Sequence, residues 1–347
     1  MTVLDKVLAL RPANAVARLG QGSRLPLLSP SELLRALEGS PAALPCVPVR
    51  AKASVPGLLA AARAEDSVLG LACSHPLADR GATERFLATV RAAAAEAEHS
   101  RPIFLQAGPV RVAKPKPEGL AVQQEAIFRL VDDGFSLVSL DVSRLEASAA
   151  VEVVRSLSSP LRERELPLEL TLPMPARESE SLTDTARPLL AGLRKGGVPV
   201  RFLRVPAAVF GEEDLDVGLL HLLVELATEF GVSVTVADVG ERSLRSLPTF
   251  VAAGVRKVDC AGPFERLALA AWPADARAIV EQKAEATGVP PGELLGLIEE
   301  QLQPLEDSAR DKLEALSFTE ATEVLSLLGV SRTGWRSMVW LAENRGD

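Results

Sequence analysis

Seven charged or amide side chains at or near the ends of short apolar runs are the residues in this chain best suited to chemistry. They are Arg50, Lys52, Gln106, Asp141, Glu169, Arg204 and Asp238. Guanidinium groups hold anions as two-pronged donors, and carboxylates orient hydroxyl groups. The set could therefore form a pocket for a phosphorylated sugar or another small anion. The other interpretation is that these charges neutralise one another as ion pairs, because buried charges must be paired.

Three of these residues could support a reaction that needs no metal. A lysine desolvated in such a site can form a Schiff base with a carbonyl substrate, which makes Lys52 a candidate catalytic residue. Asp141 and Glu169 could serve as acid and base in a metal-independent lyase. Arg50, Gln106, Arg204 and Asp238 remain as candidate ligand-binding residues.

These side chains converge only if the elements before them form one closed sheet. Between about residues 45 and 275, eight short apolar runs are each followed by a longer amphipathic stretch, the rhythm of β/α units. The expected strands are 45–49, 67–72, 102–105, 137–140, 166–172, 199–203, 232–236 and 255–258. The pattern predicts a (β/α)8 TIM barrel, in which functional residues follow the strands at one end.

Helical segments flank the barrel. We expect an N-terminal helical segment at 1–42, the barrel at 43–275 and a C-terminal helical extension at 276–347. Near its end the extension carries Trp335, Met338, Trp340 and Leu341 at helical spacing. This stripe is interpreted as packing onto the barrel or onto a second subunit. The alternative is a DNA-binding helix-turn-helix over 317–341, which has two basic residues, Arg332 and Arg336, to contact phosphates.

Composition argues against several classes of protein. The net charge is 38 − 46 = −8, aromatic residues make up 4% and tyrosine is absent, which argues against nucleic-acid binding. No apolar run reaches the roughly 18–20 residues that cross a bilayer, and the N-terminal stretch has no convincing cleavage site. We therefore expect a cytoplasmic protein, and the Ala, Leu and Arg content is typical of a bacterial genome rich in G and C.

Histidine and cysteine do not suggest a metal site. The histidines His75, His99 and His221 fall after a strand, at a helix end and inside a helix, so they cannot converge on one ion in a barrel. The cysteines Cys46, Cys73 and Cys260 lie in apolar runs and are interpreted as reduced core residues. The sequence predicts no metal and no cofactor.

Five segments resemble a known family of barrels. Residues 102–109, 133–143, 169–175, 231–238 and 253–259 resemble strands three, four, five, seven and eight of the class II fructose/tagatose-bisphosphate aldolases. The likeness is closest to the non-catalytic accessory subunit of the tagatose enzyme, in which a Gly-Pro follows the third strand. The resemblance implies a TIM barrel and, in the catalytic relatives, a divalent metal held by histidines that stabilises an enediolate.

The chain departs from that family at the metal site. Gln106, Pro109 and Ala237 stand at the positions of metal-binding histidines, and Gly108 stands where the proton-transferring aspartate is expected. The phosphate-binding Gly-Gly-Ser is replaced by residues 238–240. The resemblance therefore implies an aldolase-like barrel that has lost metal-dependent catalysis.

Three hypotheses follow for function. The chain is a structural, accessory or regulatory protein, with the C-terminal helices as the interface of a homo-oligomer or with a protein partner. Alternatively, it is a divergent metal-independent lyase or sugar-phosphate enzyme, or a sensor that binds a phosphorylated metabolite. In the eighth strand, Asp259 stands near the asparagine of the family's phosphate motif.

Overall fold

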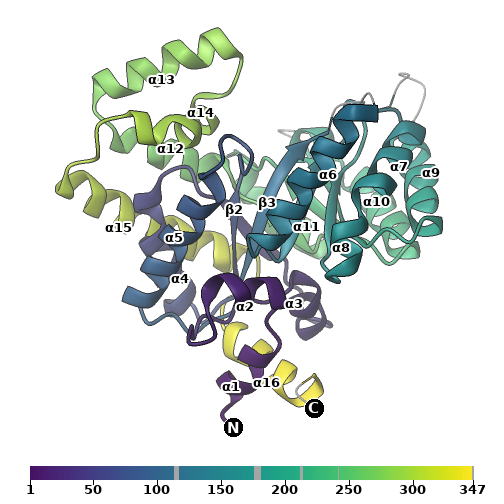
Figure 1. Ribbon diagram of the computed structural model, residues 1–347, viewed down its shortest axis with the longest axis horizontal. Coiled ribbons are helices and arrows are strands. Elements are labelled where there is room, and N and C mark those ends of the chain that lie inside the picture. The colour runs from purple at the N-terminus through teal and green to yellow at the C-terminus, as the bar shows by residue number, and fades with distance from the viewer. Residues whose placement is uncertain (113–116, 176–180, 212–213, 241, 346–347) are drawn as a thin grey trace.

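The computed structural model describes residues 1–112, 117–175, 181–211, 214–240 and 242–345. Eight parallel strands close into a barrel in which each strand pairs with its neighbours in sequence and β1 pairs with β8 (Figure 1). The predicted (β/α)8 barrel with terminal helices is confirmed. The strands are β1 (Leu44–Pro48), β2 (Leu69–Cys73), β3 (Ile103–Arg111), β4 (Leu137–Asp141), β5 (Leu168–Thr171), β6 (Val200–Pro206), β7 (Ser233–Ala237) and β8 (Lys257–Asp259).

Helices precede, link and follow the strands. Before the barrel lie α1 (Val3–Ala9), α2 (Ala13–Leu19) and α3 (Pro30–Ala36), and between the strands lie η1 (Lys52–Ser54), α4 (Val55–Ala64), α5 (Ala82–Glu96), α6 (Pro117–Asp132), α7 (Ala147–Leu157), α8 (Ser159–Glu163), α9 (Leu182–Lys195), η2 (Ala207–Phe210), α10 (Val217–Glu229), η3 (Arg242–Ser246) and α11 (Leu247–Ala252). After the barrel come α12 (Gly262–Ala271), α13 (Ala274–Thr287), α14 (Pro291–Ile298), η4 (Glu299–Gln301), α15 (Asp307–Leu327) and α16 (Gly334–Asn344).

Strand β3 is longer than the sequence predicts. The predicted strand ends at Leu105, but β3 continues to Arg111. The pairing register between β3 and β4 shifts between Ala107 and Val110, so the Gly-Pro pair forms an irregularity inside the strand rather than its end. As a result Gln106 lies within the strand and points into the barrel.

Two apolar cores hold the barrel, one on each side of its wall. Alternate strand residues point to opposite faces, and the outward-facing residues pack against the surrounding helices. The inward-facing Leu44, Phe104, Leu137 and Phe202 pack with one another and with residues of α1, α3 and α16. The terminal helices therefore close the end of the barrel where the strands begin, and the opposite end stays available for a site.

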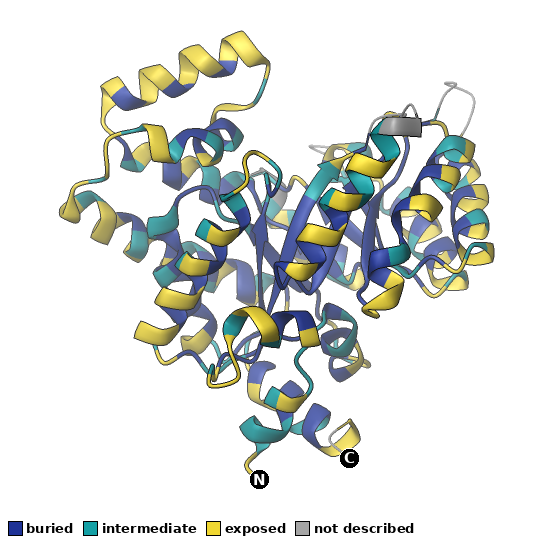
Figure 2. Ribbon diagram, in the orientation of Figure 1, coloured by how far each residue is buried: buried dark blue, intermediate teal, exposed yellow. Residues whose placement is uncertain are grey.

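The helix after the last strand does not complete the outer ring. Helix α15 makes the most extensive helix–helix contact in the structure, against α4, and also packs on α12. It therefore takes the place in the ring beside α4. Helices α13 and α14 form an arm between α12 and α15, and most of α13 is exposed (Figure 2).

The apolar stripe near the C-terminus is mostly a packing surface. Met338 and Leu341 are fully buried in the core shared with α1 and α3, whereas Trp335 is exposed. In the described part of the chain no helix combines the length and the apolar character needed to cross a membrane.

The interior of the barrel leaves no room for a larger side chain at Gly70. A Cβ at this position would overlap the ring of Phe104 on the neighbouring strand. We predict that Gly70→Ala lowers the free energy of unfolding by about 1–3 kcal/mol, because the buried ring must shift. Gly22→Ala is the control, since a Cβ there meets nothing within 4 Å. Urea denaturation measures both, and Phe104→Leu in the Gly70→Ala background should restore part of the loss.

Candidate functional site

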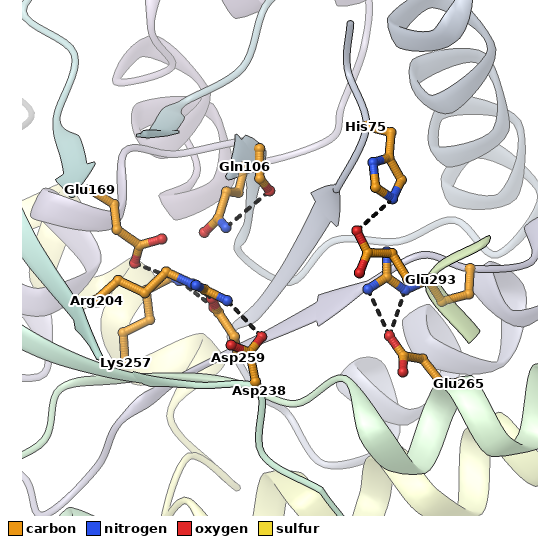
Figure 3. A network of polar contacts seen from close by, with 11 residues as sticks. His75, Gln106, Glu169, Arg204, Asp238, Lys257, Asp259, Glu265 and Glu293 are labelled. Atoms are coloured by element: carbon orange, nitrogen blue, oxygen red, sulfur yellow. Dashed lines mark hydrogen bonds and ion pairs between the residues drawn. The ribbon is translucent and has the colours of Figure 1, made fainter. Parts of the chain in front are cut away.

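A buried lysine organises the centre of the barrel. Lys257 is fully buried on β8, and its Nζ lies 2.9 Å from Glu169 Oε1 on β5 and donates a hydrogen bond to Asp259 (Figure 3). Glu169 Oε1 also accepts a hydrogen bond from Thr235 Oγ1 at 2.9 Å. Burial favours the neutral amine of Lys257, but Asp259 and Glu169 outweigh it and raise its pKa, so the ammonium ion is held between two carboxylates.

A second cation, Arg204, lies above this lysine toward the carboxyl ends of the strands. Its Nε donates to Asp259 Oδ2 at 3.1 Å, and its Nη2 donates to Asp238 Oδ1 at 2.7 Å. Burial opposes the charge of Arg204, yet Asp238 and Asp259 overcome this effect and raise its pKa. Burial likewise acts to raise the pKa of Asp259, and Lys257 and Arg204 reverse this and lower it. The two cations and their carboxylates form one linked network.

This network does not suit a divalent metal ion. Within the described residues, no group of three or more His, Cys, Asp or Glu side chains is placed to hold a metal ion. The buried carboxylates Glu169 and Asp259 already bind Lys257 and Arg204. A metal ion at the barrel axis would have to compete with two protein cations for the same oxygens.

An open cavity of about 570 Å³ lies above the network, and we call it the mouth cavity. Five of the seven residues singled out in the sequence line it: Arg50, Gln106, Asp141, Arg204 and Asp238. Val289, Glu293 and Leu297, at and before α14, cover one side of the cavity. The cavity falls in the size range of small-molecule binding sites.

Arg50 forms the wall of the mouth cavity near β1. Its Nε and Nη2 atoms lie 2.9 Å and 2.7 Å from Glu265 Oε1 on α12. Its side chain is only 8% exposed, and its buried Nη1 has no hydrogen-bond partner among the described residues. Arg50 is therefore fixed by one carboxylate and keeps one donor unused.

His75 and Glu293 meet beside Arg50. His75 Nε2 lies 3.4 Å from Glu293 Oε1, a close approach without hydrogen-bond geometry (Figure 3). Burial, followed by the charge of Arg50, lowers the pKa of His75 to about 4. At neutral pH the pair is thus a neutral imidazole beside a carboxylate, not an ion pair.

The remaining mouth residues are held by local contacts. Gln106 is buried, and its Oε1 accepts from Cys46 Sγ at 3.6 Å. Asp141 Oδ1 accepts from the backbone N–H of Ser143 at 3.0 Å, and Oδ2 lies 3.9 Å from Arg111 Nε. Gln106 therefore presents an amide to the cavity and Asp141 a carboxylate.

Two of the sequence candidates lie elsewhere. Glu169 is fully buried beneath Arg204 and does not line the mouth cavity. Lys52 is in η1, where its Nζ pairs with Glu300 and its backbone N–H donates to Glu299 Oε1 at 3.0 Å. It lines an adjoining cavity of about 90 Å³ under η4, and this cavity shares Ser74, His75, Ala78 and Leu297 with the mouth cavity. The structure thus separates Lys52 from Arg50, although only one residue lies between them.

The histidines and cysteines have structural surroundings. His99 is buried at the end of α5, and burial lowers its pKa to about 4. His221 is exposed on α10, so neither approaches His75 at the mouth. Cys46, Cys73 and Cys260 are free and buried, as the sequence predicts, and burial raises the pKa of the Cys73 thiol to about 12.

Sequence reasoning missed Lys257, Glu265 and Glu293. The signal for Lys257 was present, because a lysine between the apolar Val255 and Val258 in a strand buried on both faces needs an internal partner. Glu265 is the single acid of α12 and Glu293 is the single acid of α14, and only the folded chain places them beside Arg50 and His75.

The comparisons with known proteins agree with the fold. No protein-family model matches the sequence, and no curated protein matches it. Similar solved structures include the YdjI aldolase from Escherichia coli K12, with 14% identity, a TM-score of 0.57 and coverage of 86% of this chain and 95% of that chain. A putative fructose-1,6-bisphosphate aldolase from Coccidioides immitis has 15% identity, a TM-score of 0.57 and coverage of 88% and 96%. The fructose-bisphosphate aldolase from Campylobacter jejuni has 15% identity, a TM-score of 0.61 and coverage of 89% and 97%. This chain shares their barrel fold.

The buried network makes a prediction about stability. Lys257→Met should lower the free energy of unfolding by about 3–5 kcal/mol, because Glu169 would then be a buried charge without a cation. Adding Glu169→Gln should recover part of the loss, since the uncompensated charge is removed. Lys283→Met on the exposed helix α13 is the control. Guanidinium denaturation at neutral pH measures all three, and a loss at Lys257 no larger than at Lys283 would contradict the network's role.

Glu299 makes a prediction about pH. Burial raises its pKa from the ordinary 4.5 to about 7, although Lys52 acts in the opposite direction. Between these values the folded state keeps a proton that the unfolded state has lost, so stability falls as the pH rises through this window. Glu299→Gln removes this effect. The difference in stability between the variant and the parent protein should therefore shift in favour of the variant as the pH rises from about 5 to about 8. Thermal unfolding at both pH values measures the difference, and Glu281→Gln should show no such trend.

Proposed function

We propose that this chain is an aldolase-like barrel that has lost metal-dependent catalysis and serves as an accessory or regulatory protein with a ligand-binding mouth. The observation that carries the proposal is the occupation of the barrel axis by Lys257 and Arg204. Their cationic groups bind the buried carboxylates that a metal ion or an acid–base reaction would need. A catalytic site needs groups free to move protons or bind a metal, whereas these groups are held in fixed ion pairs.

A lysine-dependent lyase is less well supported by the geometry. Schiff-base chemistry requires a neutral amine that reaches the substrate. Lys257 is held as an ammonium ion beneath Arg204, and the side chain of Lys52 pairs with Glu300 outside the mouth cavity. Neither amine meets both requirements.

The proposed accessory role includes a protein contact through the C-terminal helices. Exposed apolar side chains occur on α13, α15 and α16, namely Ile279, Leu316, Phe318 and Trp335. Exposed apolar groups of this kind are enriched where proteins associate, which supports a second copy or another protein as partner. The three free thiols suit the reducing cytoplasm that the sequence suggests.

The proposal predicts that the protein does not bind a stoichiometric metal ion and does not cleave aldol substrates. After incubation with Zn²⁺ or Co²⁺ and desalting, elemental analysis should find well below one ion per chain. Coupled assays with fructose 1,6-bisphosphate and tagatose 1,6-bisphosphate should show no triose phosphate above the protein-free rate, under conditions in which a class II aldolase is active. Stoichiometric metal together with cleavage would overturn the proposal.

A further inference from the structure

The mouth cavity pairs donors with acceptors at two opposite places. On the β6–β7 side, Arg204 is bound to Asp238, whose side chain is 59% exposed. On the β1 side, Arg50 has an unused buried Nη1, and Glu293 stands next to His75 with its side chain 38% exposed. Each side thus places an arginine and an exposed carboxylate beside whatever occupies the cavity.

Carboxylates outnumber guanidinium groups around this space. Of the residues that line the cavity, Asp141, Asp238, Asp259 and Glu293 are acids, and Arg50, Arg111 and Arg204 are arginines. A further carboxylate, Glu265, takes two donors of Arg50. The other titratable lining group, His75, is neutral at ordinary pH because burial lowers its pKa. The cavity therefore has no surplus of positive charge.

This balance distinguishes between ligands. A phosphate group only accepts hydrogen bonds, and here it would meet exposed carboxylates while the arginines are already paired. A hydroxyl group donates one hydrogen bond and accepts others, so it satisfies a carboxylate and a guanidinium at once. The hydroxyl of Ser74, which also lines the cavity, offers the same double character.

We propose that the mouth cavity binds an uncharged polyhydroxylated molecule, a sugar or sugar alcohol without phosphate. Hydroxyls at one end of the molecule bind Asp238 and Arg204, and those at the other end bind Glu293 beside Arg50. This inference rests on the proposed function, since it assigns a ligand to the mouth of a barrel without metal chemistry. It replaces the phosphorylated ligand expected from the sequence.

Matched pairs of sugars test the proposal. Isothermal titration would compare fructose, tagatose and galactitol with fructose 1,6-bisphosphate and tagatose 1,6-bisphosphate. At least one uncharged compound should bind, and each bisphosphate should bind at least about tenfold more weakly than the tightest uncharged compound. Binding of the uncharged compound should not change with salt, because no net charge is transferred. Tighter binding of a bisphosphate, or no binding by any uncharged compound, would refute the proposal.

Two variants locate the site. Asp238→Asn and Glu293→Gln should each weaken binding of the uncharged compound by about tenfold, since each replaces an exposed acceptor of the mouth. Both should strengthen binding of the bisphosphates, because they remove negative charge. Glu281→Gln, on the exposed face of α13, should change neither. Unchanged sugar binding in both mouth variants would contradict the assignment even if a sugar binds elsewhere.

The outcome is independent of the catalytic question. Metal loading with aldol cleavage would overturn the proposed function even if the uncharged sugar binds more tightly. Preference for a bisphosphate without metal or cleavage would overturn only the ligand assignment. Circular dichroism and thermal unfolding of the variants would confirm that any loss of binding reflects the site, since both altered side chains are partly exposed.

Discussion

The structure depends on one constraint: charges inside a protein must be paired, because the interior solvates ions poorly. Four buried charged side chains, Glu169, Arg204, Lys257 and Asp259, meet this constraint together, and Arg204 also pairs with the exposed Asp238 just after β7. Lys257 links β5 to β8, and Arg204 links β6 to β7 and β8. The network therefore fixes the ends of four consecutive strands relative to one another. It also determines what the mouth cavity can do, since it sets the charge of the cavity floor.

The same constraint bears on how a barrel that shares the fold of aldolases would lose metal-dependent catalysis, as we propose for this chain. A metal-binding set of ligands at the strand ends leaves a strong positive charge on the axis when the ion is bound. Here the positive charge on the axis belongs to two side chains of the protein itself, Lys257 and Arg204, and is always present. Side chains held in ion pairs keep one charge state and one position. Acid–base catalysis instead needs groups that gain and lose protons. The barrel itself is held by the apolar residues of its strands and helices, which are separate from the charged residues on its axis.

Much of the fold could be predicted from the sequence, because apolar runs and amphipathic helices are local features. The eight strands are predicted in order, and the main error is the end of β3, which runs past the irregularity between Ala107 and Val110 to Arg111. The site was predicted only in part. Arg50, Asp141 and Asp238 stand at or just after strand ends, and Gln106 and Arg204 lie within the longer strands β3 and β6; all five line the mouth cavity. Lys52 lies outside the mouth cavity because it is in η1 and contacts the acids Glu299 and Glu300 of η4. These contacts join residues far apart in sequence, so no local pattern predicts them.

The partners of Arg50 show why the remaining contacts needed the structure. Glu265 is 215 residues away in sequence, and it reaches Arg50 because α12 leaves the barrel directly over β1. Helix α12 is free to do so because α15, not α12, packs beside α4 and completes the outer ring. The chain between them forms α13 and α14, so α14 lies over the mouth and places Glu293 beside His75. Because α15 rather than α12 completes the ring, α12 brings Glu265 to Arg50 and α14 brings Glu293 to the mouth cavity. The chemistry of the mouth is in this sense a consequence of how the C-terminal helices pack.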